Sequence, residues 1–321
     1  MTRNDDQHLL LQTARMYYED NRTQEQIARA LSLSRPTISR LLQQAREDGI
    51  VEIRVIDPQA TNRSLEKQLM ATFALRDVVV VAVEDSPPDL ARRRVGQAAA
   101  RFLARTVQSG ETVGLGWGRT LHEVALALEP RRKARVTIVP LIGGVGQISP
   151  VFQVHELARH MAEAFGGTWR SFYAPAMLET EEAAAMLRRL PDLQQVMALW
   201  DHLDCAVVGI GNFALSTEIE MLFVNYLSEA TQQRLVASHA VGDLCVRFFD
   251  VSGRPCPEAV PGVLGVSLDQ LKATRRTIGV AGGAEKAEAI LGALRGGFVN
   301  TLILDEPAAR RVLALAAEGG A

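Results

Sequence analysis

The sequence predicts a chain of the α/β class, with a small N-terminal winged helix-turn-helix followed by a larger, Rossmann-like, mainly parallel α/β domain. A length of 321 residues exceeds one compact core and suits about two domains. Residues 7–55 hold three helical patterns and then one strand-like pattern, whereas the later part alternates apolar β-rich runs with helical patterns. We therefore expect domains at 1–56 and 65–321, joined by a polar linker at 57–64.

Composition narrows the class of protein. Hydrophobic residues make up 47% and charged residues 22%, as in a soluble globular chain, and the start is too polar for a secretory signal. No apolar stretch approaches the roughly 18 residues of a membrane span, so we expect a cytoplasmic protein without membrane contact. Cys205, Cys245 and Cys256 lack the spacing of a zinc or redox site, and we expect neither a metal nor a cofactor. With a net charge of -2, any contact with nucleic acid must come from a local basic patch.

The N-terminal region has the helix start and stop signals of a helix-turn-helix. A first helix is expected over Gln7–Tyr18, and Thr23 with Gln26 forms a capping-box pattern for a second. Ser34 is a good N-cap for a third helix that ends at Gly49. The alternating segment Ile50–Val55 then predicts the strand of a wing.

The third helix predicts contact with double-stranded operator DNA. Its first acid is Glu47, so positive charge gathers on the helix that would enter a major groove. Arg40 is the residue we most expect to touch a base edge. A structural helix pair with a solvated charged face is the alternative, but the turn, cap, wing and one-sided charge together favour DNA binding. The expected DNA-contacting residues are Thr23, Gln24, Ser34, Arg35, Thr37, Ser39, Arg40, Gln43 and Gln44.

Beyond residue 64 the pattern predicts strands that are covered on both faces, because their Val, Ile and Leu runs are continuous. The expected strands are Val78–Val83, Thr112–Leu115, Val136–Leu141, Trp169–Tyr173, Cys205–Ile210, Thr277–Ala281 and Thr301–Leu304. The expected helices between them are Arg92–Thr106, Leu121–Leu128, Val154–Ala164, Ala284–Leu294 and Pro307–Ala316.

Glycine-rich loops follow several of these strands. Gly114–Thr120 joins a strand to a helix, where backbone N–H groups and the helix dipole favour an anion. Such a turn alone is as often structural as functional. Gly143–Gln147, Gly209–Asn212 and Gly282–Lys286 also follow strands, however, and ligands of parallel sheets gather at the carboxyl ends of strands. The sequence thus predicts one shared, anion-binding crevice to which Lys286 adds a cation.

Some polar and aromatic residues have two interpretations. Asp305 and Glu306 follow the last strand and could accept hydrogen bonds from sugar hydroxyls, although Asp305 before Pro307 also fits a helix cap. Asp250, with Asp243, fits a turn equally well. Trp117 could stack on a sugar or fill a gap beneath its loop. We retain Asp250, Asp305, Glu306 and Trp117 as candidate effector-binding residues.

The motifs together resemble the SorC family of sugar-responsive bacterial regulators, and the resemblance covers nearly the whole chain. It rests on QEQIARALSLSRPTISRLLQQAREDGIV, GLGWGRTL, PLIGG, VVGIGN, AVGDLCVRFFDVSGRP and IGVAGGAEKAEAILGALRGGFVNTLILDE. It implies a transcriptional regulator whose operator binding is controlled by a small sugar or sugar phosphate. The implied phosphate contacts are Gly116, Trp117, Gly118, Arg119, Thr120 and Lys286, and those near the sugar are Gly143, Gly144 and Gln147.

An enzyme is the rival hypothesis, because the effector domains of this family are similar to phosphosugar isomerases and deaminases. After Gly211 this chain has Asn212-Phe213-Ala214 in place of the deaminase-like Asp-Gly-His run, so we expect a regulator without catalysis. A third hypothesis is a regulator of unphosphorylated polyols or other small molecules. Since a helix-turn-helix usually reads paired half-sites, we expect a homodimer or homotetramer.

Overall fold

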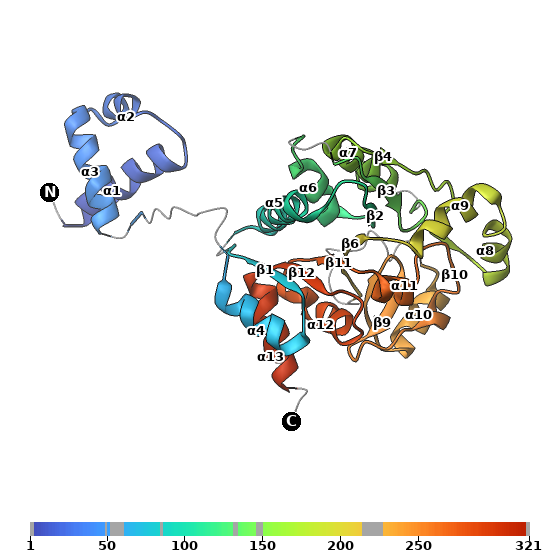
Figure 1. Ribbon diagram of the computed structural model, residues 1–321. Helices are drawn as coiled ribbons and strands as arrows, with labels where there is room; N and C mark the ends of the chain where they lie inside the picture. The colour runs from blue at the N-terminus through green and yellow to red at the C-terminus, as the bar shows by residue number, and fades with distance from the viewer. Residues whose placement is uncertain are drawn as a thin grey trace. The chain divides into compact units, whose positions relative to one another are not determined.

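The computed structural model divides the chain into two compact units, Met1–Asp57 and Pro58–Ala321, which we call the N-terminal and C-terminal units (Figure 1). Most of the predicted wing Ile50–Val55, the preceding Gly49 and the candidate ligand Gln147 lie outside the described residues. The structure describes residues 3–48, 50–51, 61–83, 86–130, 134–145, 150–213 and 227–318.

The N-terminal unit contains the three predicted helices, α1 (Arg3–Tyr18), α2 (Gln24–Leu31) and α3 (Arg35–Glu47). Thr23 and Gln26 form the predicted capping box, since each side chain accepts the backbone N–H of the other residue. Ser34 caps α3 as predicted, and its hydroxyl accepts the Thr37 N–H at 3.3 Å. Ser32, with φ of 54°, turns the chain between α2 and α3. The buried side chains between the helices are Leu10, Ala14, Met16, Ile27, Ala28, Ile38, Leu42 and Ala45.

A seven-stranded sheet, with every neighbouring pair parallel, forms the centre of the C-terminal unit and confirms the predicted Rossmann-like fold class. Its order is β1-β12-β11-β6-β2-β3-β4. Each predicted strand contributes one member, but the fourth is wrong beyond Trp169 because the chain leaves the sheet edge there. The strands are β1 (Asp77–Val81), β2 (Thr112–Leu115), β3 (Thr137–Pro140), β4 (Thr168–Trp169), β6 (Cys205–Gly209), β11 (Thr277–Val280) and β12 (Thr301–Asp305).

Helices cover both faces of this sheet, which is why its strands are apolar throughout rather than alternating (Figure 1). On one face lie α5 (Pro88–Thr106), α6 (Arg119–Ala127) and α7 (Val154–Phe165). On the other face lie α4 (Arg63–Phe73), α9 (Pro191–Trp200), α11 (Leu268–Ala273), α12 (Ala287–Arg295) and α13 (Glu306–Glu318).

The predicted linker 57–64 extends too far, because the described residues 61–64 pack on the C-terminal unit. Thr61 forms a β-bridge with Val81, and the Asn62 N–H donates to the Val80 carbonyl at 2.8 Å. The Asn62 side chain then caps α4 by accepting the Leu65 N–H at 3.2 Å. A polar run that resembles a linker is therefore a helix start.

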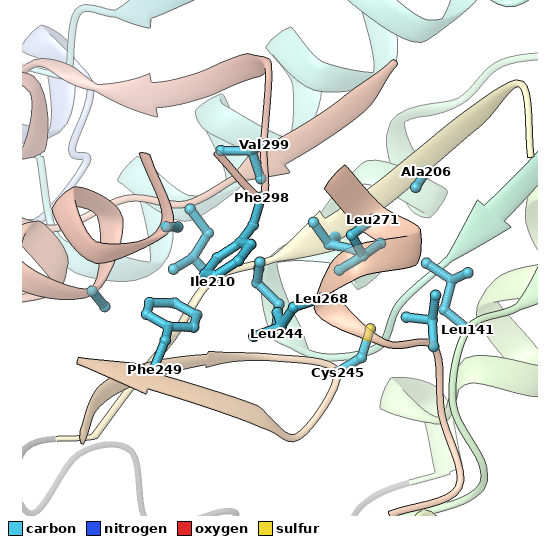
Figure 2. Packing of buried hydrophobic residues seen from close by; sticks show 14 of the residues in the cluster. Leu141, Ala206, Ile210, Leu244, Cys245, Phe249, Leu268, Leu271, Phe298 and Val299 are labelled. Carbon is cyan, nitrogen blue, oxygen red and sulfur yellow. The ribbon is translucent and has the colours of Figure 1, made fainter. Parts of the chain in front are cut away.

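Smaller elements that periodicity did not predict lie beside the main sheet. An antiparallel hairpin sheet consists of β7 (Gly211–Asn212), β8 (Ala240–Leu244) and β9 (Arg247–Asp250). Figure 2 shows its Leu244 and Phe249 within the same buried cluster as Ile210 and Phe298. The Phe249 and Phe298 rings lie 5.4 Å apart, so the hairpin is fixed to the sheet by apolar packing. The other additions are β5 (Met177–Leu178), β10 (Gly262–Val263), α8 (Glu181–Leu187), α10 (Glu229–Ala237) and 3-10 turns at Pro150–Phe152, Pro257–Ala259 and Ala284–Lys286.

A buried ion pair joins elements at the amino ends of the central strands. Glu111, just before β2, accepts hydrogen bonds at 2.7 Å from both Arg275 and Arg276, just before β11. The Glu111 and Arg276 side chains are only 6% and 7% exposed. Arg276 also donates to the Thr106 carbonyl at the end of α5. This cluster therefore joins two strands and a helix in a region of low dielectric.

Removing one member of this buried pair should destabilise the fold strongly. Glu111→Ala leaves the Arg276 guanidinium buried without its carboxylate, and we expect the free energy of unfolding to fall by about 3–5 kcal/mol in urea denaturation. Glu163→Ala, which removes an exposed partner of Arg159 on α7, is the control and should cost under about 1 kcal/mol. Similar small losses in both variants would contradict the structural role assigned to Glu111.

Candidate functional site

In the N-terminal unit, α3 presents one exposed polar face opposite its buried one. Arg35, Ser39 and Arg40 are exposed, whereas Ile38 and Leu42 on the other face are buried in the core. The first turn of α3 contains no acid. The exposed face therefore has the positive charge and the donors that a major groove accepts.

Three of the predicted DNA contacts, Thr23, Ser34 and Thr37, also form hydrogen bonds within the N-terminal unit. The side-chain oxygens of Thr23 and Ser34 accept the helix-cap hydrogen bonds of α2 and α3. Thr37, half-buried, has its hydroxyl 2.7 Å from that of Ser34, and Gln24 is half-buried at the start of α2. The caps orient the helix starts, and the hydroxyls can still meet a phosphate as acceptors or donors.

Two of the three glutamines in the predicted set, both on α3, pair with acids one helical turn later. The Gln43 amide donates to Glu47 at 2.9 Å, and the Gln44 amide is 3.4 Å from Asp48. Among the described residues, Arg40 has no such acidic partner, and it lies exposed one turn earlier.

One pocket of the C-terminal unit lies where the strand order of the main sheet reverses. From β2 the sheet continues through β3 and β4, and from β6 it continues in the opposite direction through β11 and β12. The Gly116 N–H donates to the Val207 carbonyl of β6 at 2.9 Å, so the ends of β2 and β6 remain side by side. The pocket opens at these carboxyl ends, with a volume of about 130 Å³, as expected for a ligand crevice in a parallel sheet.

The glycine-rich turn before α6 forms one wall of this pocket, and all five residues of Gly116–Thr120 line it. Gly118 is the N-cap of α6 and adopts a φ of 113°, a conformation that residues with a Cβ rarely adopt. Because glycine has no side chain, no side-chain group caps α6 here. The start of the helix dipole is therefore directed at whatever the pocket holds.

Three cationic side chains and one carboxylate line the pocket among the described residues. Arg92 comes from α5, Arg119 from the start of α6, and Lys286 from the turn before α12. The Lys286 Nζ donates to the Ile210 carbonyl at 3.3 Å, which holds the ammonium at the end of β6. Asp243 of β8 supplies the carboxylate. The surplus of positive charge favours an anionic ligand.

The β8–β9 hairpin supplies Asp243, for which the sequence predicted only a turn. Its Oδ2 accepts the Val246 N–H at 2.9 Å, and this bond supports a turn in which Cys245 and Val246 have φ of 49° and 66°. A positive φ is costly for a β-branched residue such as Val246, so this turn is strained and needs its surroundings to hold it. The strain places Cys245 against the pocket. Burial raises the pKa of the Cys245 thiol, which stays protonated.

Further pocket residues follow β6 on the neighbouring strand end. Gly209 and Gly211 line the pocket on either side of Ile210, and Asn212 donates to the Glu285 carbonyl at 3.1 Å. Phe213 and Phe248 add an aromatic edge, with ring centroids 5.9 Å apart. The glycine run had indicated the first of these residues. No sequence pattern indicated Phe213 and Phe248, because only the folded hairpin brings them together at the pocket.

Three other predicted effector contacts lie away from this pocket. At Gly143 a Cβ would meet the Ala174 carbonyl oxygen at 2.4 Å, so this glycine permits close backbone packing. Gly144 lines a different hollow near Val145. Asp250 lines yet another hollow, and its carboxylate accepts an Arg254 hydrogen bond at 2.7 Å. Burial raises the pKa of Asp250, but the hydrogen bonds from Arg254 and Ser252 together lower it by more. The pKa of Asp250 therefore lies below its usual range. These residues therefore do not join the strand-end pocket.

Asp305 and Glu306 also serve the fold rather than the pocket. Asp305 is 2% exposed, and its carboxylate accepts the Ala308 N–H at 3.0 Å and the Gly283 N–H at 2.7 Å. It thus caps α13, the alternative considered from the sequence, and burial raises its pKa. Glu306 forms an ion pair with Arg310 on its own helix.

The described ranges contain neither a cluster of metal ligands nor a membrane-spanning helix. Within them, no three His, Cys, Asp or Glu side chains gather as metal ligands would. No described helix has the length and apolar character needed to cross a bilayer.

The close contact between Gly211 and Asp243 predicts a sharp difference between two neighbouring glycines. A Cβ at position 211 would lie 1.9 Å from the Asp243 carboxylate, so Gly211→Ala should lower the free energy of unfolding by about 1–3 kcal/mol. At Gly209 the nearest atom, the Trp117 carbonyl oxygen, is 3.6 Å away, and Gly209→Ala should be nearly neutral. Urea denaturation of both variants tests this, and equal stabilities would show that the hairpin is not packed as described.

Comparison with known proteins identifies two families along the chain. The family described as "Putative sugar-binding domain" matches residues 57–314, which is most of the chain. The family described as "Crp-like helix-turn-helix domain" matches residues 7–60.

Similar proteins match over nearly their whole length. The deoxyribonucleoside regulator of Bacillus subtilis (strain 168) is 33% identical over 96% of this chain and 97% of its own. The sorbitol operon regulator of Klebsiella pneumoniae is 33% identical over 98% of this chain and 100% of its own.

Solved structures agree with these similarities. The full-length sorbitol operon regulator SorC from Klebsiella pneumoniae has a TM-score of 0.75 at 32% identity, covering 96% of this chain and 99% of that one. A transcriptional regulator from Streptococcus pneumoniae TIGR4 has a TM-score of 0.74 at 28% identity, covering 79% of this chain and 97% of that one. By its fold, its motifs and these full-length similarities, the chain belongs to the SorC family of sugar-responsive, DNA-binding transcriptional regulators.

Proposed function

We propose that the strand-end pocket binds a phosphorylated sugar and that its occupancy controls the binding of α3 to operator DNA. The observation that carries this proposal is the convergence of Arg92, Arg119 and Lys286 on a pocket that also faces the uncapped start of α6. A phosphate carries about −1.5 to −2 charges at neutral pH and suits such a site. The relatives named deoxyribonucleoside regulator and sorbitol operon regulator support a sugar as the effector class.

Within this proposal the pocket residues have distinct roles. Thr120 offers a backbone and a hydroxyl donor to the phosphate, Gly116 and Gly118 permit its close approach because they have no side chain, and Arg119 and Lys286 offer charge. Asp243 accepts hydrogen bonds from sugar hydroxyls, in place of the Asp250, Asp305 and Glu306 proposed from the sequence. Trp117, which lines the pocket, packs against the sugar ring.

The N-terminal unit reads DNA in the proposed mechanism. Arg35, Ser39 and Arg40 meet bases and phosphates, while Thr23, Gln24, Ser34, Thr37, Gln43 and Gln44 position the helices on the backbone. Two copies of α3 are needed for paired half-sites, so we propose a homodimer or homotetramer. A chain that binds chromosomal operators works in the cytoplasm. The linker connecting the two domains ends before Thr61, which the C-terminal unit holds.

We further propose that the pocket binds its ligand without converting it. Its described lining includes no histidine, the residue most often used as a general acid or base. After Gly211 the chain has Asn212 and Phe213 in place of the Asp-Gly-His run that the resemblance to deaminases would imply. Incubation of the purified protein with sugar phosphates should leave them unchanged, and turnover at ordinary enzymatic rates would contradict the proposal.

Two substitutions should separate the two functions. Arg40→Ala removes a proposed base contact, so affinity for an operator selected from random DNA should fall by about 1–3 kcal/mol, measured by fluorescence anisotropy. Lys286→Ala should leave operator affinity unchanged while weakening the response to the effector, found by a thermal-shift screen of sugars and sugar phosphates.

Arg29→Ala is the matched control for the DNA contact, since Arg29 is exposed on α2 and pairs with Glu25 at 2.7 Å. It should alter operator affinity less than Arg40→Ala. If Lys286→Ala lost both DNA binding and the effector response without a change in folding, the assignment of these two functions to separate units would be wrong.

A further inference from the structure

Arg92 differs from the other cations of the pocket because it comes from a helix body rather than from a loop that follows a strand. It lies in the second turn of α5 and lines the pocket with Arg119 and Lys286. Its side chain is 21% exposed, so the guanidinium is largely withdrawn from bulk water. Neither the glycine-rich motifs nor the family resemblance assigns it a role.

The guanidinium of Arg92 has a weak partner in this structure. Its NH1 donates to Asp89 Oδ1 at 2.7 Å, one helical turn earlier on α5. The Asp89 side chain is 89% exposed, and ion pairs with so much water access are weak and screened by salt. Among the described residues, no other ion pair or hydrogen bond holds this guanidinium. A doubly charged anion inside the pocket can therefore displace Asp89.

The first turns of α5 are attached to the part of the C-terminal unit that follows the linker. Arg94 donates to the Val83 carbonyl at 3.3 Å and to the Ser86 hydroxyl at 2.9 Å, which joins α5 to the segment after β1. The last residue of β1, Val81, forms the β-bridge with Thr61. Arg94, two residues after Arg92, thus joins the start of α5 to the segment that follows β1, the strand that Thr61 contacts.

We propose that Arg92 is a third cationic contact of the effector's phosphate and that Asp89 competes with this phosphate for the guanidinium. This inference rests on the proposed function of the pocket. On binding, the hydrogen bond from Arg92 to Asp89 is exchanged for a charge-assisted bond to a phosphate oxygen, and no covalent bond changes. Arg92 then determines how tightly the pocket holds an anion, and Asp89 lowers that affinity.

Binding of inorganic phosphate to the full-length protein tests the proposal. Isothermal titration, with sodium chloride to keep ionic strength constant, gives the dissociation constant for each variant. Arg92→Ala should weaken phosphate binding by about 10- to 100-fold, as expected for loss of a hydrogen bond to a charged group. Asp89→Asn keeps the shape of the side chain and removes its charge, and it should tighten binding by about 2- to 5-fold.

Arg93→Ala is the matched control, because Arg93 is adjacent on the same helix but is exposed and lies 3.9 Å from Glu123 outside the pocket. It should leave phosphate affinity unchanged, and thermal melting of each variant without phosphate monitors folding. Arg92→Lys should recover part of the affinity, since it restores the charge without the planar fork.

Different failures lead to different conclusions. If Lys286→Ala and Arg119→Ala abolish phosphate binding while Arg92→Ala and Arg93→Ala bind like the unmodified protein, the role of Arg92 is refuted and the pocket's function stands. If Asp89→Asn weakens binding while its melting temperature is unchanged, Asp89 is no competitor. If the unmodified protein binds no phosphate, both the inference and the phosphate site are refuted.

Discussion

The pairing of β2 with β6 is the constraint on which the rest of the C-terminal unit depends. These strands start the two opposite halves of the sheet, so the loops after them diverge to opposite faces and leave a crevice between them. The Gly116 N–H bond to the Val207 carbonyl extends this pairing to the edge of the pocket. Without that extension, the α6 helix start and the loop after Gly209 would not face the same ligand.

Charge in the pocket is assembled from elements that are far apart in sequence. Arg92 comes from the second turn of α5, Arg119 from the start of α6 and Lys286 from the turn before α12, whereas Asp243 comes from a hairpin on a separate small sheet. Charges in a partly enclosed pocket interact more strongly than exposed charges, because less water screens them. The same reasoning explains why the exposed Asp89 is a weak partner for Arg92, whereas Glu111 and Arg276, both buried, form a strong structural link.

Local chemistry explains what could be predicted. Caps such as Thr23 and Ser34 depend on side chains within three residues, and the apolar runs of β2, β6 and β11 are continuous because both faces are covered. The turn at Gly116–Thr120 could be predicted because the backbone at position 118 has a positive φ, which favours glycine and so leaves a mark in the sequence. Asn62 was assigned to a linker because a polar cap and a polar linker have the same composition.

The sequence by itself determined the two-part architecture, the helix-turn-helix, the strands of the parallel sheet and the loop that opens α6, since each depends on residues close together in the chain. Only the tertiary structure decided which polar residues share the pocket. Arg92 and Asp243 line the pocket in the folded chain, whereas Asp305 caps a helix and the Asp250 carboxylate stabilises a turn. The physical reason is that a carboxylate or guanidinium has the same local pattern whether it caps a helix or faces a ligand. Its role depends on which distant backbone and charges the folded chain places beside it.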